Sequence, residues 1–480
     1  MKDHIATALD AATAAGATYA DARVVETRHE RLSVRTGRVD GVESGESLGI
    51  GIRAIAHGAW GFAATSDLTV QGINAAAVEA VALARAAATT LRRPVSLAPV
   101  GTFTDTWTGP YEIDPFTVPL DDKLALLLLA DDVLRVEKDV RVTSSSMNFL
   151  AVHKVFGSTE GSLIEQSYVE SQAGLTAFAI GDGEMLPRSY PNNLGGQAVQ
   201  GGWEAILALD LPGHAPRIAG EAAALLTTAP CPAGDTTLII DASQVALQVH
   251  ESIGHPTELD RVLGDEAAFA GTSWVSIPDL DELRYGSEHV TVTADATIPG
   301  SIGSFGYDDE GVPAQRDHLI TGGVLTGFQT SRESALAIGR TSNGCMRADG
   351  WQRQPLIRMT TVSLEPGEWT LDDLIADTDD GFYFETNNSW SIDDKRLNFQ
   401  FACEIGWEIK NGKLGRMVKN PNYTGITPEF WGSCDAVCDR DHWQVWGIPN
   451  CGKGEPMQVA HVAHGAAPAR FRNVRVGVVR

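Results

Sequence analysis

The segment Asp21–Asp67 constrains the fold most strongly, because its apolar side chains recur at every second position between glycines. This alternation is typical of strands with one buried face, and the glycines mark turns between them. The segment therefore predicts a meander of antiparallel strands. A helix is expected on either side of it, in the N-terminal MKDHIATALDAATAAG and in the alanine-rich Leu68–Leu91, which has no internal proline.

The next part of the chain predicts a second group of helices and strands. Arg92–Pro119 contains five prolines and is expected to be a linker. We then expect a helix at Leu120–Val136 and strands within Val140–Gly181. These are followed by a loop over GDGEMLPRSYPNNLGG and by a helical stretch at Gly202–Thr227 that is interrupted at Pro212. Beyond Thr237 the pattern favours short strands, with one motif-bearing helix and a short helix near Ser331–Ile338.

These patterns predict an α+β protein with two domains. Pro230–Cys231–Pro232 suggests the boundary between an N-terminal α+β domain, residues 1–229, and a β-rich C-terminal domain, residues 230–480. The N-terminal domain is expected to combine an antiparallel sheet with helices and to contain the linker at about 92–119. The C-terminal domain is expected to carry the motif-bearing helix.

Charge and apolar patterning exclude several classes of function. A formal charge of −25 would repel nucleic-acid phosphates. The longest apolar stretch, Leu124–Ala130, is far shorter than the roughly 20 residues that span a bilayer. The first residues carry Asp3 and Asp10 and lack the apolar core of a secretory signal. Six scattered cysteines indicate reduced thiols, so a cytoplasmic location is expected. The charge and the short apolar stretches predict no nucleic-acid or membrane partner.

The most informative segment is TTLIIDASQVALQVHESIGHPTELDR. An apolar strand, Thr237–Ile240, precedes Asp241 and Ser243, either of which could cap a helix through Val245–Val249. That helix presents His250, Glu251 and His255 in the pattern HExxxH. The pattern is one residue longer than HExxH, in which two histidines bind zinc and the glutamate is the general base.

The longer spacing has a structural consequence. On a regular α-helix, residues i and i+5 point about 140° apart, so His250 and His255 could not bind one ion. The chain must therefore be rewound between them. Gly254 offers a permissive backbone and Pro256 disfavours α geometry at His255, so we expect a π-bulge or a helix end at Gly254–His255. Taken alone, the motif is also compatible with a helix end that carries two surface histidines.

The segment HESIGHPTELD resembles the metal-binding motif of the TldD/PmbA family. A second resemblance lies near the C-terminus, where NCGKGEPMQVAHVAHGAAPARFRNVRVG matches the family's Cys-Gly-Lys setting before a final hairpin. Further similar stretches include YDDEGVPAQR, GGVLTGFQTSRESA, SNGCMRADG, PLIRMTTVSLEPG and GESLGIGIRAIAHGAWGFAATSD. The resemblance implies a zinc metallopeptidase of the catalytic, TldD-like branch. It implies His250, His255 and Cys451 as Zn²⁺ ligands and Glu251 as the catalytic base.

Three protein ligands with an open fourth position are typical of catalytic zinc. The expected reaction is hydrolysis of peptide bonds in short or unfolded peptides. The family resemblance also implies two similar subunits around a cavity, as a homodimer or a heterodimer with a TldE/PmbA-like subunit. Two alternatives stay open: a non-catalytic partner or scaffold subunit, and a metal-dependent amidase acting on a non-peptide substrate.

Other polar clusters have competing interpretations. His461 and His464 could assist the site as ligands or oxyanion donors, although their segment favours strand or turn. Cys434 and Cys438 are expected to be structural thiols rather than half of a metal site. Asp308–Asp309–Glu310 is expected to form a turn rather than a calcium site. The segment Lys419–Ile448, which contains Cys434 and Cys438, has no functional interpretation from the sequence.

Overall fold

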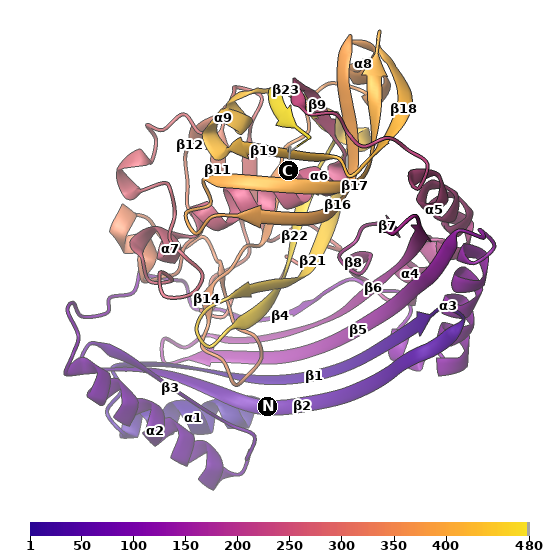
Figure 1. Cartoon of the computed structure of the whole chain (residues 1–480). Coiled ribbons are helices and arrows are strands. Elements are labelled where there is room, and N and C mark those ends of the chain that lie inside the picture. Colours follow the sequence, from indigo (N-terminus) through magenta and orange to yellow (C-terminus); the bar gives the residue numbers. More distant parts are fainter. Residues whose placement is uncertain (478–480) are drawn as a thin grey trace.

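The computed structural model describes residues 1–477, and its first half is built on one large sheet with strand order β3-β2-β1-β5-β6-β4. Strands β7 and β8 also pair with β6, and all pairs are antiparallel except β4 with β6. Figure 1 shows the long strands curving across the molecule. The strands are β1 (Tyr19–Arg35), β2 (Arg38–Ala56), β3 (Ala59–Thr65), β4 (Thr104–Thr108), β5 (Val140–Ser158), β6 (Leu163–Gly181), β7 (Glu184–Tyr190) and β8 (Gln197–Gln200).

Two groups of helices pack at opposite ends of this sheet (Figure 1). One group is α1 (Lys2–Ala14) and α2 (Val70–Ala88); the other is α3 (Leu120–Leu134), α4 (Trp203–Ala208) and α5 (Leu211–Leu225). Helix α2 begins where the Thr69 hydroxyl accepts the Gly72 N–H at 3.1 Å. Gly61 lets α2 approach β3 closely, because a Cβ there would lie 2.0 Å from the Ala80 carbonyl oxygen.

Two expectations for this half were wrong. The proline-rich segment at 92–119 contains β4, which pairs in parallel with β6, and the segment expected as a loop after Gly181 contains β7. Strand β7 pairs with β6 alone, so Pro187 lies on an edge where its missing N–H breaks no ladder. The interruption in the next helical stretch is confirmed: α5 starts after Asp210, which caps it, and carries Pro212 in its first turn.

The second half contains two further sheets and a short hairpin. One sheet has the order β12-β11-β10-β15-β22-β21. Its strands are β10 (Val292–Asp295), β11 (Arg316–Thr321), β12 (Val324–Leu325), β15 (Thr361–Leu364), β21 (Gln444–Lys453) and β22 (Gln458–Ala466). The hairpin pairs β13 (Met346–Arg347) with β14 (Leu356–Ile357).

The third sheet has the order β16-β9-β23-β19-β17-β18 and closes on itself, because β16 also pairs with β17; β20 joins it beside β23. Strand β23 therefore fills the middle of the sheet, between β9 and β19. The members are β9 (Gly234–Ile240), β16 (Asp380–Ile392), β17 (Asn398–Lys410), β18 (Lys413–Lys419), β19 (Asn422–Ile426), β20 (Cys434–Val437) and β23 (Ala469–Val476). The α-helices of this half are α6 (Ala242–Val249), α7 (Leu259–Leu263), α8 (Leu371–Ala376) and α9 (Thr427–Gly432).

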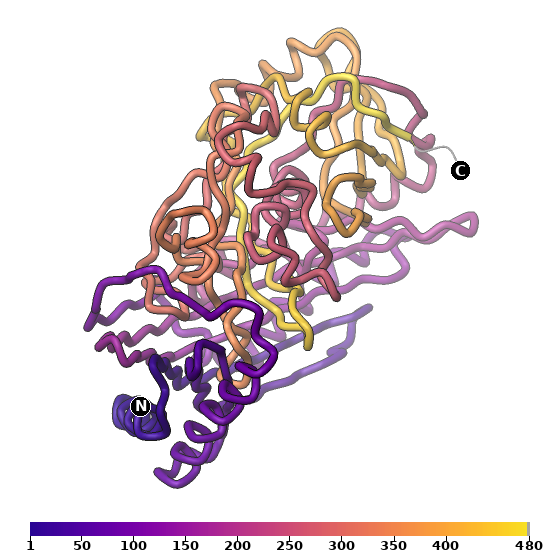
Figure 2. Tube along the Cα trace, turned by 90° about the vertical axis from the view of Figure 1, so that its left-hand side faces the viewer, coloured from indigo at the N-terminus to yellow at the C-terminus, as the bar shows by residue number. Residues whose placement is uncertain are grey.

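This half lies over one side of the long sheet in both views (Figures 1 and 2). The predicted fold class, α+β with a β-rich second half, is confirmed. The short helix expected near Ser331–Ile338 is a 3₁₀ helix at Ser334–Ile338. Within residues 1–477, no helix is both long and apolar enough to cross a membrane.

Buried ion pairs join the two halves. Asp309 lies 3.4 Å from Arg23 and 2.5 Å from Lys154, both on the long sheet, and Glu310 lies 3.3 Å from Arg53. Burial by itself raises the pKa of Asp309, but Lys154 and Arg23 outweigh it and lower the pKa to about 2. These acidic residues thus bind side chains of the protein, which agrees with the expected turn rather than with calcium ligands.

Candidate metal centre

The HExxxH segment lies at the end of α6, directly after strand β9. The Asp241 carboxylate caps α6 by accepting the N–H groups of Ser243 and Gln244 at 3.0 and 3.2 Å. Asp241 also accepts the Thr386 N–H of β16 at 3.1 Å, which ties the start of the helix to the neighbouring strand. The cap and the strand before it place the two histidines at a fixed distance from the closed sheet.

The segment from His250 to Gly254 forms a π-turn, as the spacing predicts. The N–H of His255 donates to the carbonyl of His250, five residues earlier, and this wider turn brings the two rings to the same side. The ring centroids are 4.8 Å apart. The predicted reasons for the turn were wrong, however: Gly254 (φ −56°) and His255 (φ −63°) both have ordinary right-handed helical backbones.

Steric crowding, rather than backbone flexibility, explains why residue 254 is a glycine. A Cβ on Gly254 would lie 2.1 Å from the sulfur of Met359, which is fully buried. Any larger side chain would push the π-turn away from the core. The glycine therefore keeps the two histidines close to strand β21.

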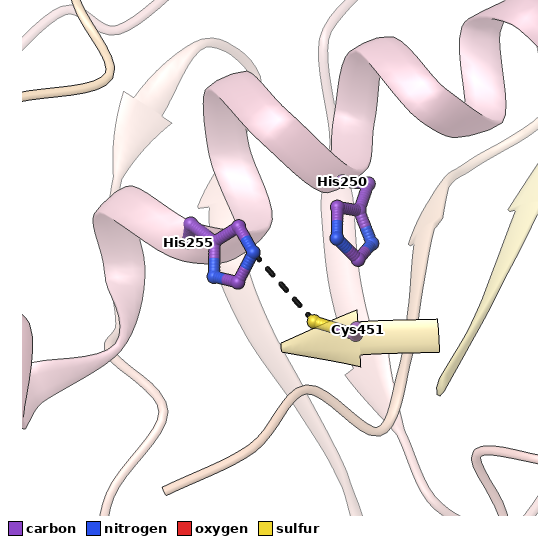
Figure 3. A group of neighbouring side chains, drawn as sticks. All are labelled: His250, His255 and Cys451. Carbon is purple, nitrogen blue, oxygen red and sulfur yellow. Dashed lines mark hydrogen bonds between the residues drawn. The ribbon is translucent and has the colours of Figure 1, made fainter. Parts of the chain in front are cut away.

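Three side chains converge at this point: His250, His255 and Cys451 (Figure 3). Their ligand atoms all lie within 4.8 Å of one another, and Cys451 Sγ is 3.6 Å from His255 Nε2. Within residues 1–477 this is the one group of three or more His, Cys, Asp or Glu side chains with such spacing. The pairing of β21 with β22 slips between Ile448 and Cys451, a bulge that turns the cysteine towards the histidines.

Hydrogen bonds on the far side of each ring fix which nitrogen faces the thiol. His464 Nδ1 lies 2.8 Å from the Val362 carbonyl, which only accepts, so this nitrogen carries the proton. Neutral His464 then accepts through Nε2 from His250 Nδ1, at 2.8 Å. His255 Nδ1 donates to Glu258 Oε2, also at 2.8 Å. The Nε2 atoms of His250 and His255, which lie close to the Cys451 thiol, are thereby left with a free lone pair.

The local electrostatics favour a thiolate at Cys451 and neutral rings at His255 and His464. At His250 burial lowers the pKa, but the charge of Cys451 outweighs burial and raises the pKa. Burial raises the pKa of the Cys451 thiol, but the nearby charges of Arg358, His250 and His255 outweigh it and hold the pKa well below its usual value. Burial lowers the pKa values of His255 and His464 well below the ordinary value. A thiolate and neutral rings are the forms that bind metal.

Glu251 lies beside the three ligands and is held by the hairpin between β16 and β17. Its Oε1 accepts the indole N–H of Trp390 at 2.8 Å, and its Oε2 forms an ion pair with Arg396. Sequence reasoning missed both partners, because neither has a motif of its own. It also missed the role of Glu258, although the offset of three residues from His255 is a recognisable helical spacing.

The segment Lys419–Ile448, which had no interpretation from the sequence, supports the π-turn from behind. The Trp431 indole donates to the Ser252 hydroxyl at 2.8 Å, and the Tyr423 hydroxyl donates to Gln248 Oε1 at 2.9 Å. Both aromatic side chains are fully buried. They satisfy polar groups of the distorted helix that would otherwise lack partners in the core.

The remaining candidates lie outside the ligand group. His461 is on the opposite face of β22 from His464 and forms an ion pair with Glu170 of β6. His464 contacts His250 and is not part of the group of three side chains that could hold a metal. Cys434 and Cys438 are free, buried thiols, and burial raises the pKa of each to about 12, as expected for structural cysteines.

The donor set fits zinc. Two imidazole nitrogens and a thiolate suit this borderline-soft ion better than magnesium or calcium. Ligands at 2.0–2.3 Å from a tetrahedral ion are about 3.5 Å apart, close to the 3.6 Å between Cys451 Sγ and His255 Nε2. Three such ligands would leave the fourth position of a tetrahedral ion open, which is the arrangement of metal-dependent hydrolases.

Comparisons with known proteins agree with this class. Three family models match in order along the chain: PmbA/TldA metallopeptidase domain 1 at residues 20–87, the central domain at 113–228 and the C-terminal domain at 233–477. The chain belongs to the PmbA/TldD metallopeptidase family.

Curated relatives carry the same description. A metalloprotease of Methanothermobacter thermautotrophicus is 30% identical over 459 residues, covering 96% of this chain and 95% of the relative. A protein of Saccharolobus solfataricus named zinc metalloprotease TldD homolog is 25% identical over 252 residues, covering 51% of this chain and 52% of that protein. The protein is accordingly a metalloprotease of this family.

Solved structures show the same fold at low sequence identity. A candidate modulator of a DNA gyrase from Thermotoga maritima superimposes with a TM-score of 0.78 and 16% identity, covering 99% of this chain and 100% of that one. TldE from Thermococcus kodakarensis gives a TM-score of 0.73 at 16% identity, with the same coverage.

Proposed function

We propose that the protein is a zinc-dependent peptidase in which His250, His255 and Cys451 bind the ion and Glu251 is the general base. The observation that carries the proposal is the convergence of two Nε2 lone pairs and a low-pKa thiol within 4.8 Å. A zinc ion held by such ligands acts as a Lewis acid, polarising a carbonyl and lowering the pKa of a water ligand.

The protein's own groups supply the remaining chemistry. Glu251 follows His250 in the π-turn, so its carboxylate lies beside the open side of the ligand group. It takes the proton of the attacking water and later delivers it to the leaving amine. Glu258 and His464 hold the two imidazoles in the tautomer that binds metal.

We further propose that the substrates are short or unfolded peptides and that the active form is a dimer. An enclosed site would exclude folded chains, which supports selectivity by access rather than by sequence. The partner is a second copy or a TldE/PmbA-like subunit, and a cytoplasmic location with no nucleic-acid or membrane partner is part of the same proposal. The catalytic domain of this proposal is residues 230–480, and the N-terminal domain is residues 1–229.

Three measurements test the proposal. Elemental analysis of protein purified without chelator should give about one zinc per chain, and digestion of a peptide library, followed by mass spectrometry, should give cleavage products that disappear on chelation. Absence of a transition metal would refute the site. Zinc without peptide cleavage would favour a partner subunit or an amidase. The enclosed dimer would be refuted if light scattering showed a stable monomer and this monomer also cleaved a folded protein substrate.

A further inference from the structure

Four cationic side chains surround the candidate metal centre, and three of them lie behind the ligands. Arg261, Arg358 and Lys453 are fully buried. Lys453 lies 3.4 Å from Glu258, the partner of His255; Arg358 donates to the Cys451 carbonyl, and Arg261 lies 3.8 Å from Glu258. Each therefore holds a ligand or its partner in place from the core side.

Arg396 differs from these three in position. Its side chain is 18% exposed and it reaches the site from the turn between β16 and β17, where it contacts Glu251 rather than a ligand's support. The guanidinium contacts the carboxylate of Glu251, the residue directly after His250 in the π-turn. It therefore stands on the open side of the site.

The turn presents Arg396 in a defined orientation. Its backbone has φ +64°, a conformation that side-chain-bearing residues rarely adopt. The Thr427 hydroxyl donates to the Arg396 carbonyl at 2.8 Å, and the Thr427 N–H donates to the Leu397 carbonyl at 2.8 Å. The guanidinium also has unused capacity, because its buried Nε has no hydrogen-bond partner. A held backbone and a spare N–H suit a group that contacts a substrate.

We propose that Arg396 is a further catalytic residue, which stabilises the oxyanion formed when water adds to the scissile peptide bond. The inference rests on the proposed peptidase function. Before the reaction Arg396 is paired with the negative charge of Glu251, and during the addition that charge moves to the substrate oxygen. The Arg396 guanidinium then moves a short distance, from the Glu251 carboxylate to the oxyanion.

The addition step balances without any further reactant. The water oxygen forms a bond to the carbonyl carbon, one water proton passes to Glu251, and the electron pair of the carbonyl π bond moves to the carbonyl oxygen. Glu251 becomes neutral as the oxyanion appears, so the ion pair that held Arg396 is lost when its new partner forms. The Trp390 indole, a neutral donor, stays on Glu251 and keeps it in position.

The test compares Arg396→Ala and Arg396→Lys with Lys395→Ala, which removes an exposed cation from the same turn. We expect Arg396→Ala to lower kcat by about 10²–10³-fold, the usual effect of losing an oxyanion donor, with KM and zinc content unchanged. Added guanidinium should restore part of the rate, Arg396→Lys should be intermediate, and Lys395→Ala should match the wild type. Thermal unfolding checks that each variant is folded.

A binding measurement separates this role from a structural one. A phosphinic peptide with the sequence of the best substrate mimics the tetrahedral intermediate, and calorimetry should show its affinity falling by the same factor as kcat/KM in Arg396→Ala. Unchanged phosphinate affinity, or a loss confined to KM, would overturn the proposal. Absence of hydrolysis by the wild-type protein would instead refute the peptidase function, and this inference with it.

Discussion

Replacing His464 tests whether a residue outside the proposed ligand set controls the affinity for zinc. His464 is fully buried, accepts from His250 Nδ1 at 2.8 Å and is itself fixed by the Val362 carbonyl at 2.8 Å. In His464→Phe the ring volume stays but the acceptor is lost. No water can replace the acceptor in a filled core, so the His250 imidazole loses both its orientation and the bond that raises its basicity.

The expected loss can be stated in advance. Removing such a supporting partner weakens metal binding by about 10–100-fold, which corresponds to about 1.4–2.7 kcal/mol. The assay is a competition titration of zinc against a chromophoric chelator at neutral pH. His464→Gln, whose amide oxygen can accept the same hydrogen bond, should recover part of the affinity.

The neighbouring histidine supplies the matched control. His461 lies on the same strand, but on the opposite face, and pairs with Glu170. His461→Ala should leave the zinc dissociation constant unchanged, even if it lowers stability. A folded His464→Phe protein with wild-type zinc affinity would refute the tautomer argument. An equal loss in both variants would point to general destabilisation instead.

Four further outcomes are expected. Glu251→Gln should lower peptide hydrolysis at least about 100-fold with zinc retained, measured by turnover and elemental analysis. Cys451→Ser should lose zinc on dialysis, because a hydroxyl rarely replaces a thiolate; retention would place the third ligand elsewhere. Gly254→Ala should lower both the melting temperature and zinc affinity through its clash, whereas Gly220→Ala in α5, with open space around it, should not. Asp309→Asn should lower the free energy of unfolding by about 2 kcal/mol at pH 7: the folded pKa is depressed to about 2, so the contribution is present above about pH 4 and is lost below it. This would be contradicted if urea titrations gave the same difference in unfolding free energy between the wild type and Asp309→Asn at pH 7 and at pH 2.5.

The elements with strong local patterns were predictable, and those defined by distant partners were not. The Ala-rich helix α2 and the strands β1 to β3 follow from periodicity within a short window. Strand β7 was missed because Pro187 disfavours a strand locally, and β4 was missed because it lies between Pro99 and Pro110 in a proline-rich segment; pairing with β6 stabilises both strands. Here tertiary pairing outweighed the local preference.

The residues of the candidate site also differ in whether a local sequence pattern predicts them. His250, Glu251 and His255 are neighbours in the sequence, so their spacing was enough to predict the π-turn. Cys451 was found through resemblance, since nothing local marks it as a ligand. The contacts of Trp390 and Arg396 with Glu251 depend on how one hairpin lies over α6, which spacing does not encode.

Strand β23 has a consequence for when the enzyme becomes active. It lies in the middle of the closed sheet, beside β9, from which α6 begins, and it follows Cys451 and His464 in the chain. During synthesis the segment with both histidines therefore emerges well before Cys451, the third ligand that we propose, and before strand β23. With the ligand set that we propose, a growing chain has two of its three metal ligands until Cys451 is made, so we expect peptidase activity to appear only after the C-terminal strands have been synthesised.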